Sequence, residues 1–252
     1  MRALAIFHNE VERLAMRELA ARVDGLRAGD PIAPGARVVE CDCTFDELER
    51  RLAVNPPVFV HDLLPIEDGI NPRKTLWNRK VGYHHYLICR SELKLYEAIE
   101  LFGIPISSGE LAVDLGAAPG GWSYVLASRG MRVTAVDPGE LDIRVRDHPL
   151  ITHARTTAGR FLQEGTQGSA ALLVNDMKME PERSCALMND FARILIPNGW
   201  ALTTLKLPTN AVPSWPGIIN KARSFLEQSY DVAGIRQLRS NRSEVCCALK
   251  RK

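Results

Sequence analysis

The sequence predicts a doubly wound, mostly parallel α/β sheet of seven strands with an antiparallel final strand, preceded by a small N-terminal α/β module. Three observations support this fold class. Apolar runs that suit buried strands alternate with helix-like stretches over residues 91–252. A glycine-rich turn, DLGAAPGGW at 114–122, follows the first of these runs. Two extended stretches flank SNRS (240–243) at the close of the chain, which is typical of an antiparallel hairpin.

Residues 1–65 form the predicted N-terminal module. Short strands are expected at 3–7, 37–41 and 57–64, with a helix in each interval. Thr44 opens the second helix and Glu47 follows three positions later, which is a capping-box pattern. GDPIAPG (29–35) is rich in Gly and Pro and is expected to be a loop.

Residues 66–90 have a different character and form a predicted linker. The segment has little helical or alternating periodicity, and cations such as Arg79 and Lys80 alternate with rings such as Trp77 and Tyr83. It suits either a solvated connection or a segment that contacts RNA, because cations bind phosphates and rings stack on bases. The sequence leaves both interpretations open.

The larger domain is expected to span residues 91–252. Ser91 is placed to cap its first helix, and Pro181 to begin a later one. Its seven strands are expected at 111–115, 131–136, 151–154, 170–174, 200–205, 231–238 and 244–249.

Charge and hydropathy exclude several function classes. The 252 residues carry a formal net charge of +2, so a nucleic-acid partner would have to bind a local basic patch. Charge interrupts the N-terminal apolar residues at Glu10, which disfavours a signal peptide. No stretch approaches the roughly 18 apolar residues of a membrane span. We therefore expect a cytoplasmic protein.

The six cysteines do not predict a metal site. Cys41 and Cys43 are spaced as C-x-C, and Cys246 and Cys247 are adjacent, so neither pair matches the C-x-x-C pattern of zinc knuckles. We expect reduced thiols and no metal.

The glycine-rich turn predicts a ligand site. In doubly wound sheets, ligands bind at the carboxyl ends of the strands. Gly116, Gly120 and Gly121 lack side chains, so a ligand could approach the backbone closely. Their G-x-x-x-G-G spacing fits neither the dinucleotide fingerprint nor the phosphate-binding loop. Asp114 favours a cationic amino group over a pyrophosphate.

Asp137 identifies the expected ligand. It ends the second strand, about 20 residues after the glycine turn, where an acid accepts hydrogen bonds from ribose hydroxyls. Taken alone, Asp137 could simply form a turn with Pro138 and Gly139. A ribose beside one acid and an ammonium beside another together describe S-adenosylmethionine.

Four further polar residues stand at strand ends or helix starts where this fold places its chemistry. Asp176 follows the fourth strand, Lys206 ends the fifth, Glu244 begins the last, and Lys94 lies in the first turn of the helix before the sheet. A lysine at the end of a core strand is costly to bury without an acidic partner. Any one of these residues could instead be a solvated lysine or a capping acid.

The segments CRSELKL, DLGAAPGGW, VNDM, LKLP and SEV occur in the order seen in the FtsJ-like family of RNA ribose methyltransferases. Over roughly residues 85–250 the chain resembles this family, and the RlmM-type enzymes of large-subunit ribosomal RNA most. The resemblance implies a seven-stranded Rossmann-like methyltransferase sheet and a catalytic Lys-Asp-Lys-Glu tetrad at Lys94, Asp176, Lys206 and Glu244. It also implies a cofactor site lined by Ser91, Asp114, Gly116, Ala118, Pro119, Gly120, Gly121, Trp122, Asp137 and Asp176.

The resemblance also implies the reaction. A ribose 2′-hydroxyl needs a base to take its proton, and the family pattern gives this role to Lys206. A second cation nearby, Lys94, would disfavour the protonated form of that amine. The chain departs from the family at Ala158, where an Asp usually stands beside the adenine amino group; Thr157 or backbone carbonyls would serve instead.

Two other functions remain open on the sequence. A non-catalytic RNA-binding or ribosome assembly factor could retain this fold, although the complete tetrad argues against it. A small-molecule methyltransferase is disfavoured by the basic segments 73–90 and 238–242, which suit a polyanionic substrate. PVFVHDLLPI (57–66) resembles the strand that ends the accessory RNA-binding region of RlmM-type proteins, which implies that role for the N-terminal module.

Overall fold

A computed structural model describes residues 1–66, 71–72, 87–164 and 169–252 of the chain. The chain divides into two compact units, Met1–His84 and His85–Lys252. Most of the predicted 66–90 linker lies outside the described residues, so its expected RNA contacts stay a prediction.

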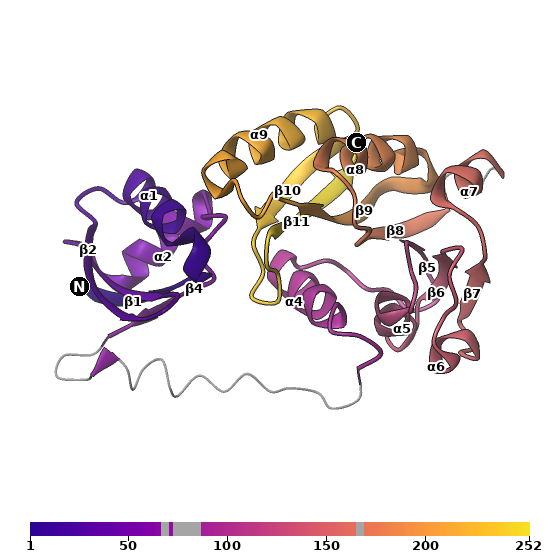
Figure 1. Cartoon of the computed structure of the whole chain (residues 1–252), viewed down its shortest axis with the longest axis horizontal. Coiled ribbons are helices and arrows are strands. Elements are labelled where there is room, and N and C mark those ends of the chain that lie inside the picture. Colours follow the sequence, from indigo (N-terminus) through magenta and orange to yellow (C-terminus); the bar gives the residue numbers. More distant parts are fainter. Residues whose placement is uncertain (67–70, 73–86, 165–168) are drawn as a thin grey trace. The chain divides into compact units, whose positions relative to one another are not determined.

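The first unit is a four-stranded antiparallel sheet with two helices on one side (Figure 1). Its strands lie in the order β2-β3-β1-β4. Apolar side chains such as Leu4 and Val38 form a buried cluster on this sheet. The elements are β1 (Arg2–Ile6), η1 (Asn9–Val11), α1 (Glu12–Arg22), β2 (Arg27–Ala33), β3 (Ala36–Glu40), α2 (Phe45–Val54) and β4 (Asp62–Pro65).

Two sequence predictions for this unit are wrong. The expected loop 29–35 is mostly strand β2, which forms a hairpin with β3. Pro31 is tolerated because β2 is an edge strand with an irregular register. The expected strand 57–64 is shorter and later, because only Asp62–Pro65 pairs with β1. The Thr44 cap is confirmed, since its side chain accepts a hydrogen bond from the Glu47 backbone N–H at 3.3 Å.

The second unit is a seven-stranded sheet in the order β10-β11-β9-β8-β5-β6-β7. In Figure 1, α4 and α5 lie on one face of the sheet and α8 and α9 on the other. The strands are β5 (Leu111–Leu115), β6 (Arg132–Val136), β7 (Ile151–Ala154), β8 (Ala170–Asn175), β9 (Leu195–Lys206), β10 (Tyr230–Arg236) and β11 (Glu244–Arg251). The helices are α4 (Glu92–Phe102), α5 (Gly121–Ala127), α6 (Ile143–Arg146), α7 (Ala158–Glu164), α8 (Pro181–Phe191) and α9 (Trp215–Leu226), with short turns η2 (Ala192–Ile194) and η3 (Val212–Ser214).

The predicted sheet topology is confirmed. β5, β6, β7, β8 and β9 pair in parallel, whereas β11 runs antiparallel to both β9 and β10. From β5 the chain proceeds outward through β6 and β7, then returns to place β8 on the other side of β5. The strand order therefore reverses between β5 and β8, where open α/β sheets bind their ligands.

Candidate active site

The predicted charged residues Lys94, Asp176, Lys206 and Glu244 meet in one cluster, called here the charged tetrad. Lys94 Nζ lies 2.9 Å from Asp176 Oδ2 and 2.8 Å from Glu244 Oε1. Lys206 Nζ lies 2.6 Å from Asp176 Oδ1 and also contacts Glu244 Oε2. Each amine is therefore shared by both carboxylates, and the four formal charges balance.

Sheet register explains how residues far apart in sequence reach this cluster. Glu244, the first residue of β11, pairs directly with Lys206, the last residue of β9. Asp176 follows β8, whose Asn175 is in register with Thr203 of β9. Lys94 comes from the first turn of α4. Three strand ends and one helix start thus place the tetrad at one edge of the sheet.

The tetrad is mostly buried, which strengthens the attraction between its opposite charges. Burial alone would lower the pKa of Lys94, but the Asp176 and Glu244 carboxylates outweigh it and raise that pKa. Burial would raise the pKa of Asp176, but Lys206 and Lys94 lower it. At neutral pH, Lys94 is therefore a cation and Asp176 an anion.

A cavity of about 460 Å³ opens beside the tetrad, within the size range of small-ligand sites. Asp176 lines this cavity and also belongs to the tetrad, so it joins the two. The other lining residues come from the ends of β5, β6 and β8 and from the start of α7: Gly116, Ala118, Val136, Asp137, Pro138, Thr157, Ala158, Met177 and Lys178.

Asp137 holds two loops of the cavity together. Its Oδ2 accepts a hydrogen bond from the Ala118 N–H at 3.1 Å, and its Oδ1 accepts one from the Gly139 N–H at 2.6 Å. An ionised carboxylate offers about four lone-pair sites, so acceptor capacity remains for a ligand.

The glycines of the turn are explained by protein neighbours. Gly116 and Gly120 have φ values of +72° and +105°, which disfavour any other residue. A Cβ on Gly116 would lie 2.1 Å from Met177 Cγ, and one on Gly120 would lie 2.5 Å from Val145. A Cβ on Gly121 would lie 2.5 Å from Cys89 Sγ. Packing thus favours glycine at all three positions, and Gly116 also lines the cavity.

Six of the predicted cofactor residues do not line the cavity: Ser91, Asp114, Pro119, Gly120, Gly121 and Trp122. The Trp122 indole N–H donates to the Ser91 carbonyl at 2.7 Å, which ties the start of α4 to α5. Ser91 occupies the predicted cap position, but its hydroxyl makes no cap bond and lies 2.9 Å from Cys89 Sγ. Pro119 is exposed and Gly120 and Gly121 are buried.

Asp114 has a buried environment of its own. Only 2% of the residue is exposed, and its Oδ2 accepts a hydrogen bond from the Ser123 hydroxyl at 2.7 Å. Burial raises the pKa of this carboxyl to about 7, against the opposing effect of the Ser123 hydrogen bond. The described structure thus pairs Asp114 with Ser123, away from the cavity lining.

Sequence reasoning missed one member of the tetrad's surroundings, Thr204. Its hydroxyl lies 2.6 Å from Asp176 Oδ1 and 2.8 Å from Lys206 Nζ. The signal was available, because residues two apart on a strand point to the same face. Threonine is, however, common in strands, so a threonine within an apolar strand does not by itself indicate a functional site.

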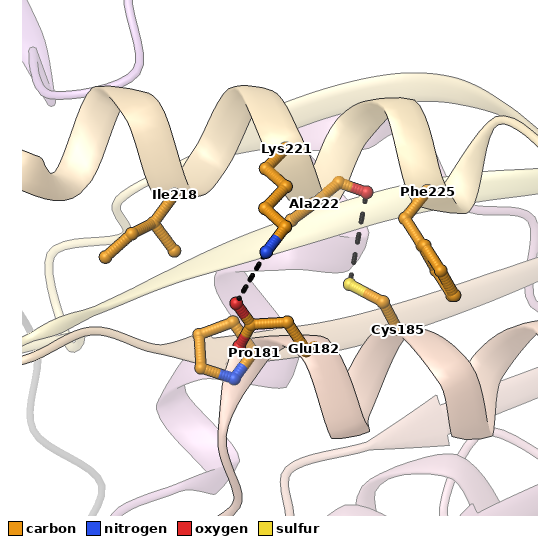
Figure 2. Close-up of a pocket in the computed structure, with 7 residues that line it drawn as sticks. All are labelled: Pro181, Glu182, Cys185, Ile218, Lys221, Ala222 and Phe225. Atoms are coloured by element: carbon orange, nitrogen blue, oxygen red, sulfur yellow. Dashed lines mark hydrogen bonds and ion pairs between the residues drawn. The ribbon is translucent and has the colours of Figure 1, made fainter.

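A second hollow lies between α8 and α9 (Figure 2). It is lined mainly by apolar groups such as Ile218 and Phe225, with the Lys221–Glu182 ion pair at its edge. Its free volume of about 20 Å³ holds roughly one water molecule. It is too small for a cofactor.

Within the described ranges, no three His, Cys, Asp or Glu side chains are grouped to hold a metal ion. Nor does the described part of the chain contain a helix both long and apolar enough to cross a bilayer.

The sequence profile of FtsJ-like methyltransferases matches residues 87–239. The chain belongs to this family. The match covers most of the second unit, including Lys94, Asp176 and Lys206 but not Glu244, and it confirms the resemblance found in the sequence.

Curated relatives of this FtsJ-like methyltransferase carry the name ribosomal RNA large subunit methyltransferase M. The one from Methylococcus capsulatus is 34% identical over an alignment of 256 residues, and this alignment covers 94% of this chain and 66% of that protein. The one from Edwardsiella ictaluri is 43% identical over 129 residues, or 47% of this chain and 32% of that protein. The chain thus spans less than two thirds of the length of these relatives.

Solved structures support the fold of this FtsJ-like methyltransferase. A putative hemolysin from Streptococcus thermophilus gives a TM-score of 0.56 at 15% identity, covering 96% of this chain and 86% of that one. Another from Lactococcus lactis gives 0.57 at 19% identity, covering 67% and 90%. At such identities the likeness concerns the fold alone.

Proposed function

We propose that this chain transfers a methyl group from S-adenosylmethionine to a ribose 2′-hydroxyl of RNA, with large-subunit ribosomal RNA as the substrate. The observation that carries the proposal is the position of Lys206. Its amine is anchored by Asp176 and Glu244, and Asp176 also lines the neighbouring cavity. A base is thereby fixed next to a space that suits a methyl donor.

The cavity suits S-adenosylmethionine by its size and its donor and acceptor groups. Asp137 would accept hydrogen bonds from the ribose hydroxyls, since it retains free acceptor sites. Asp176 and the backbone around Gly116 would face the amino acid end. Thr157 and Ala158 line the part of the cavity left for adenine, where Ala158 offers no side-chain acceptor. When bound, the cofactor supplies an electrophilic methyl group on a sulfonium.

The chain's own contribution is alignment and proton removal. Because the pKa of Lys94 is raised, Lys94 keeps its proton and is unsuited to act as a base. Lys206 has the more exposed side chain, at 23% against 13% for Lys94. We therefore assign proton removal to Lys206. With Lys206 in its neutral form, the hydroxyl oxygen would gain the methyl group as its proton passes to Lys206 Nζ. The bond from that methyl group to the sulfonium sulfur would break, and the cofactor would leave as a neutral thioether. Most of the rate gain would come from alignment.

RNA as the substrate is supported by the relatives' name and by exposed cations near the tetrad. Arg239 and Arg242 are exposed on the turn between β10 and β11, which leads directly into Glu244. Cations placed there would bind phosphates on either side of the target ribose. The target nucleotide would have to be unpaired to reach the tetrad. The N-terminal unit would add binding surface, and the reaction would take place in the cytoplasm.

Methyl transfer to RNA tests this proposal. Purified chain is incubated with radiolabelled S-adenosylmethionine and either total RNA or isolated large ribosomal subunits, and the labelled nucleosides are then separated. We expect label in a 2′-O-methylated nucleoside of large-subunit RNA. Label on a base would contradict the proposed chemistry, and an absence of transfer to every RNA would favour a non-catalytic binding factor.

A further inference from the structure

The Thr204 hydroxyl contacts two members of the charged tetrad, one of which is the proposed base Lys206. Thr204 is 1% exposed and lies on the same face of β9 as Lys206. Its Oγ1 lies 2.8 Å from Lys206 Nζ and 2.6 Å from Asp176 Oδ1. One small neutral group thus contacts both a cation and an anion of the tetrad.

The chemistry of the partners fixes the direction of both hydrogen bonds. An ammonium only donates, so Thr204 Oγ1 accepts from Lys206. An ionised carboxylate only accepts, so the Thr204 hydroxyl hydrogen points to Asp176. The low pKa of Asp176 keeps that carboxylate ionised. The hydroxyl is therefore locked in one orientation while Lys206 carries its proton.

Thr204 also completes the coordination of the amine. A lysine ammonium has three hydrogens, and three oxygens surround Lys206 Nζ: Asp176 Oδ1, Glu244 Oε2 and Thr204 Oγ1. Two of these partners are charged and can only accept. Thr204 alone is neutral and can both accept and donate. Of the three partners, Thr204 is therefore the one that can stop accepting a hydrogen bond when Lys206 loses a proton.

We infer that Thr204 is a positioning residue for Lys206. This inference rests on the proposed function of Lys206 as the base. Thr204 holds the protonated amine by accepting its third hydrogen, while Asp176 and Glu244 hold the other two. When the amine is neutral it has two hydrogens, which the carboxylates retain, and the hydroxyl no longer accepts. Release of this contact would free the lone pair of Lys206 to take the proton of the ribose hydroxyl.

Thr204→Val tests this role because valine keeps the shape of threonine and removes the hydroxyl. We expect turnover at saturating cofactor and RNA to fall about tenfold or more, since a misplaced reacting group costs up to about a hundredfold. The dissociation constant of S-adenosylmethionine should stay within about twofold. Thr204→Ser restores the hydroxyl and should restore turnover to within about threefold of the unmodified chain.

Thr203→Val is the matched control. Thr203 is also a buried strand threonine, but its hydroxyl contacts Asn175 and Ser184 rather than the tetrad. This variant should lose thermal stability to a similar degree as Thr204→Val while its turnover stays within about twofold.

Three outcomes would overturn the inference. These are full turnover in Thr204→Val, equal losses of turnover in both valine variants, and failure of Thr204→Ser to restore turnover. Failure of the underlying function looks different, because the unmodified chain would then transfer no methyl group to RNA, or Lys206→Ala would remain active. The proposed function and the role of Thr204 are thereby tested separately.

Discussion

Lys206 and Glu244 stand directly opposite each other where β9 and β11 pair, and the Lys206 amine contacts Glu244 Oε2. The register of an antiparallel pair thus joins a base candidate to an acid 38 residues away in the sequence. Asp176 reaches the same amine from the end of β8. The sheet itself, rather than a flexible loop, fixes the geometry of the proposed proton transfer.

Asp176→Asn should impair both stability and turnover. In this variant the amines of Lys94 and Lys206 share the single carboxylate of Glu244. The loss of a buried charge partner should lower the free energy of unfolding by about 3 kcal/mol. The lowered pKa of Asp176 means that its carboxylate stabilises the fold at neutral pH and loses this effect as the pH falls through that pKa. Urea unfolding at pH 7 and in acid should therefore show a smaller difference between variant and unmodified chain in acid.

Asp142→Asn is the control for that experiment, because the Asp142–Arg144 ion pair is on the surface. An unfolding midpoint for Asp176→Asn that equals the control's at pH 7 would contradict the structural role of the tetrad.

Asp137→Ala should weaken cofactor binding. It removes the acceptor expected for the ribose hydroxyls and releases the Ala118 and Gly139 backbone groups that Asp137 ties together. We expect the dissociation constant of S-adenosylmethionine, measured by calorimetry, to rise about tenfold or more, as hydrogen bonds to a charged group are lost. Glu140→Ala changes an exposed acid of the same loop and should bind normally. Equal affinities in the two variants would place the ribose elsewhere.

Ala158→Asp should strengthen cofactor binding. Ala158 lines the cavity at the first residue of α7, where a carboxylate could accept a hydrogen bond from the adenine amino group. A gain of about tenfold in affinity is expected from a hydrogen bond to a charged acceptor. Gly159→Asp adds the same charge one residue later, outside the cavity lining, and should give no gain. Similar affinities in both variants would argue against adenine at this position.

Asp114→Asn should stabilise the protein only at higher pH. Burial raises the pKa of Asp114 to about 7, so the folded state keeps a proton that the unfolded chain releases above pH 4. Stability therefore falls as the pH rises from about 4 to 7, by up to about 4 kcal/mol. The asparagine side chain of the variant does not ionise, so its free energy of unfolding does not fall in this way. The difference in unfolding free energy should favour the variant at pH 8 relative to pH 5, and a difference independent of pH would contradict the assignment.

The parallel sheet was predictable because each buried strand is a short apolar run bounded by helix signals. The convergence of Lys94, Asp176, Lys206 and Glu244 was likewise predictable, because polar residues at strand ends share one edge of such a sheet. Strand β2 was not predictable from its Pro and Gly content. Those residues usually indicate a loop, and only the pairing with β3 shows that Pro31 lies in an edge strand.

The finer features of the site depend on contacts that the sequence does not display. Thr204 joins the tetrad only through the register of β9 with its neighbours. Gly116 and Gly120 pack against Met177 and Val145, which are distant in sequence. Asp114 has the residue type expected for a cofactor contact, but its burial beside Ser123 is a tertiary effect.

Lys206→Ala tests the central claim most directly, in a paired measurement of cofactor binding and of methyl transfer to large-subunit RNA. Lys206 does not line the cavity, so affinity for S-adenosylmethionine should stay within about threefold of the unmodified chain. Transfer should fall by about 10²–10⁴-fold, the usual contribution of a positioned base. Turnover equal to that of the unmodified chain, with the cofactor bound normally, would contradict the assignment of Lys206 as the base.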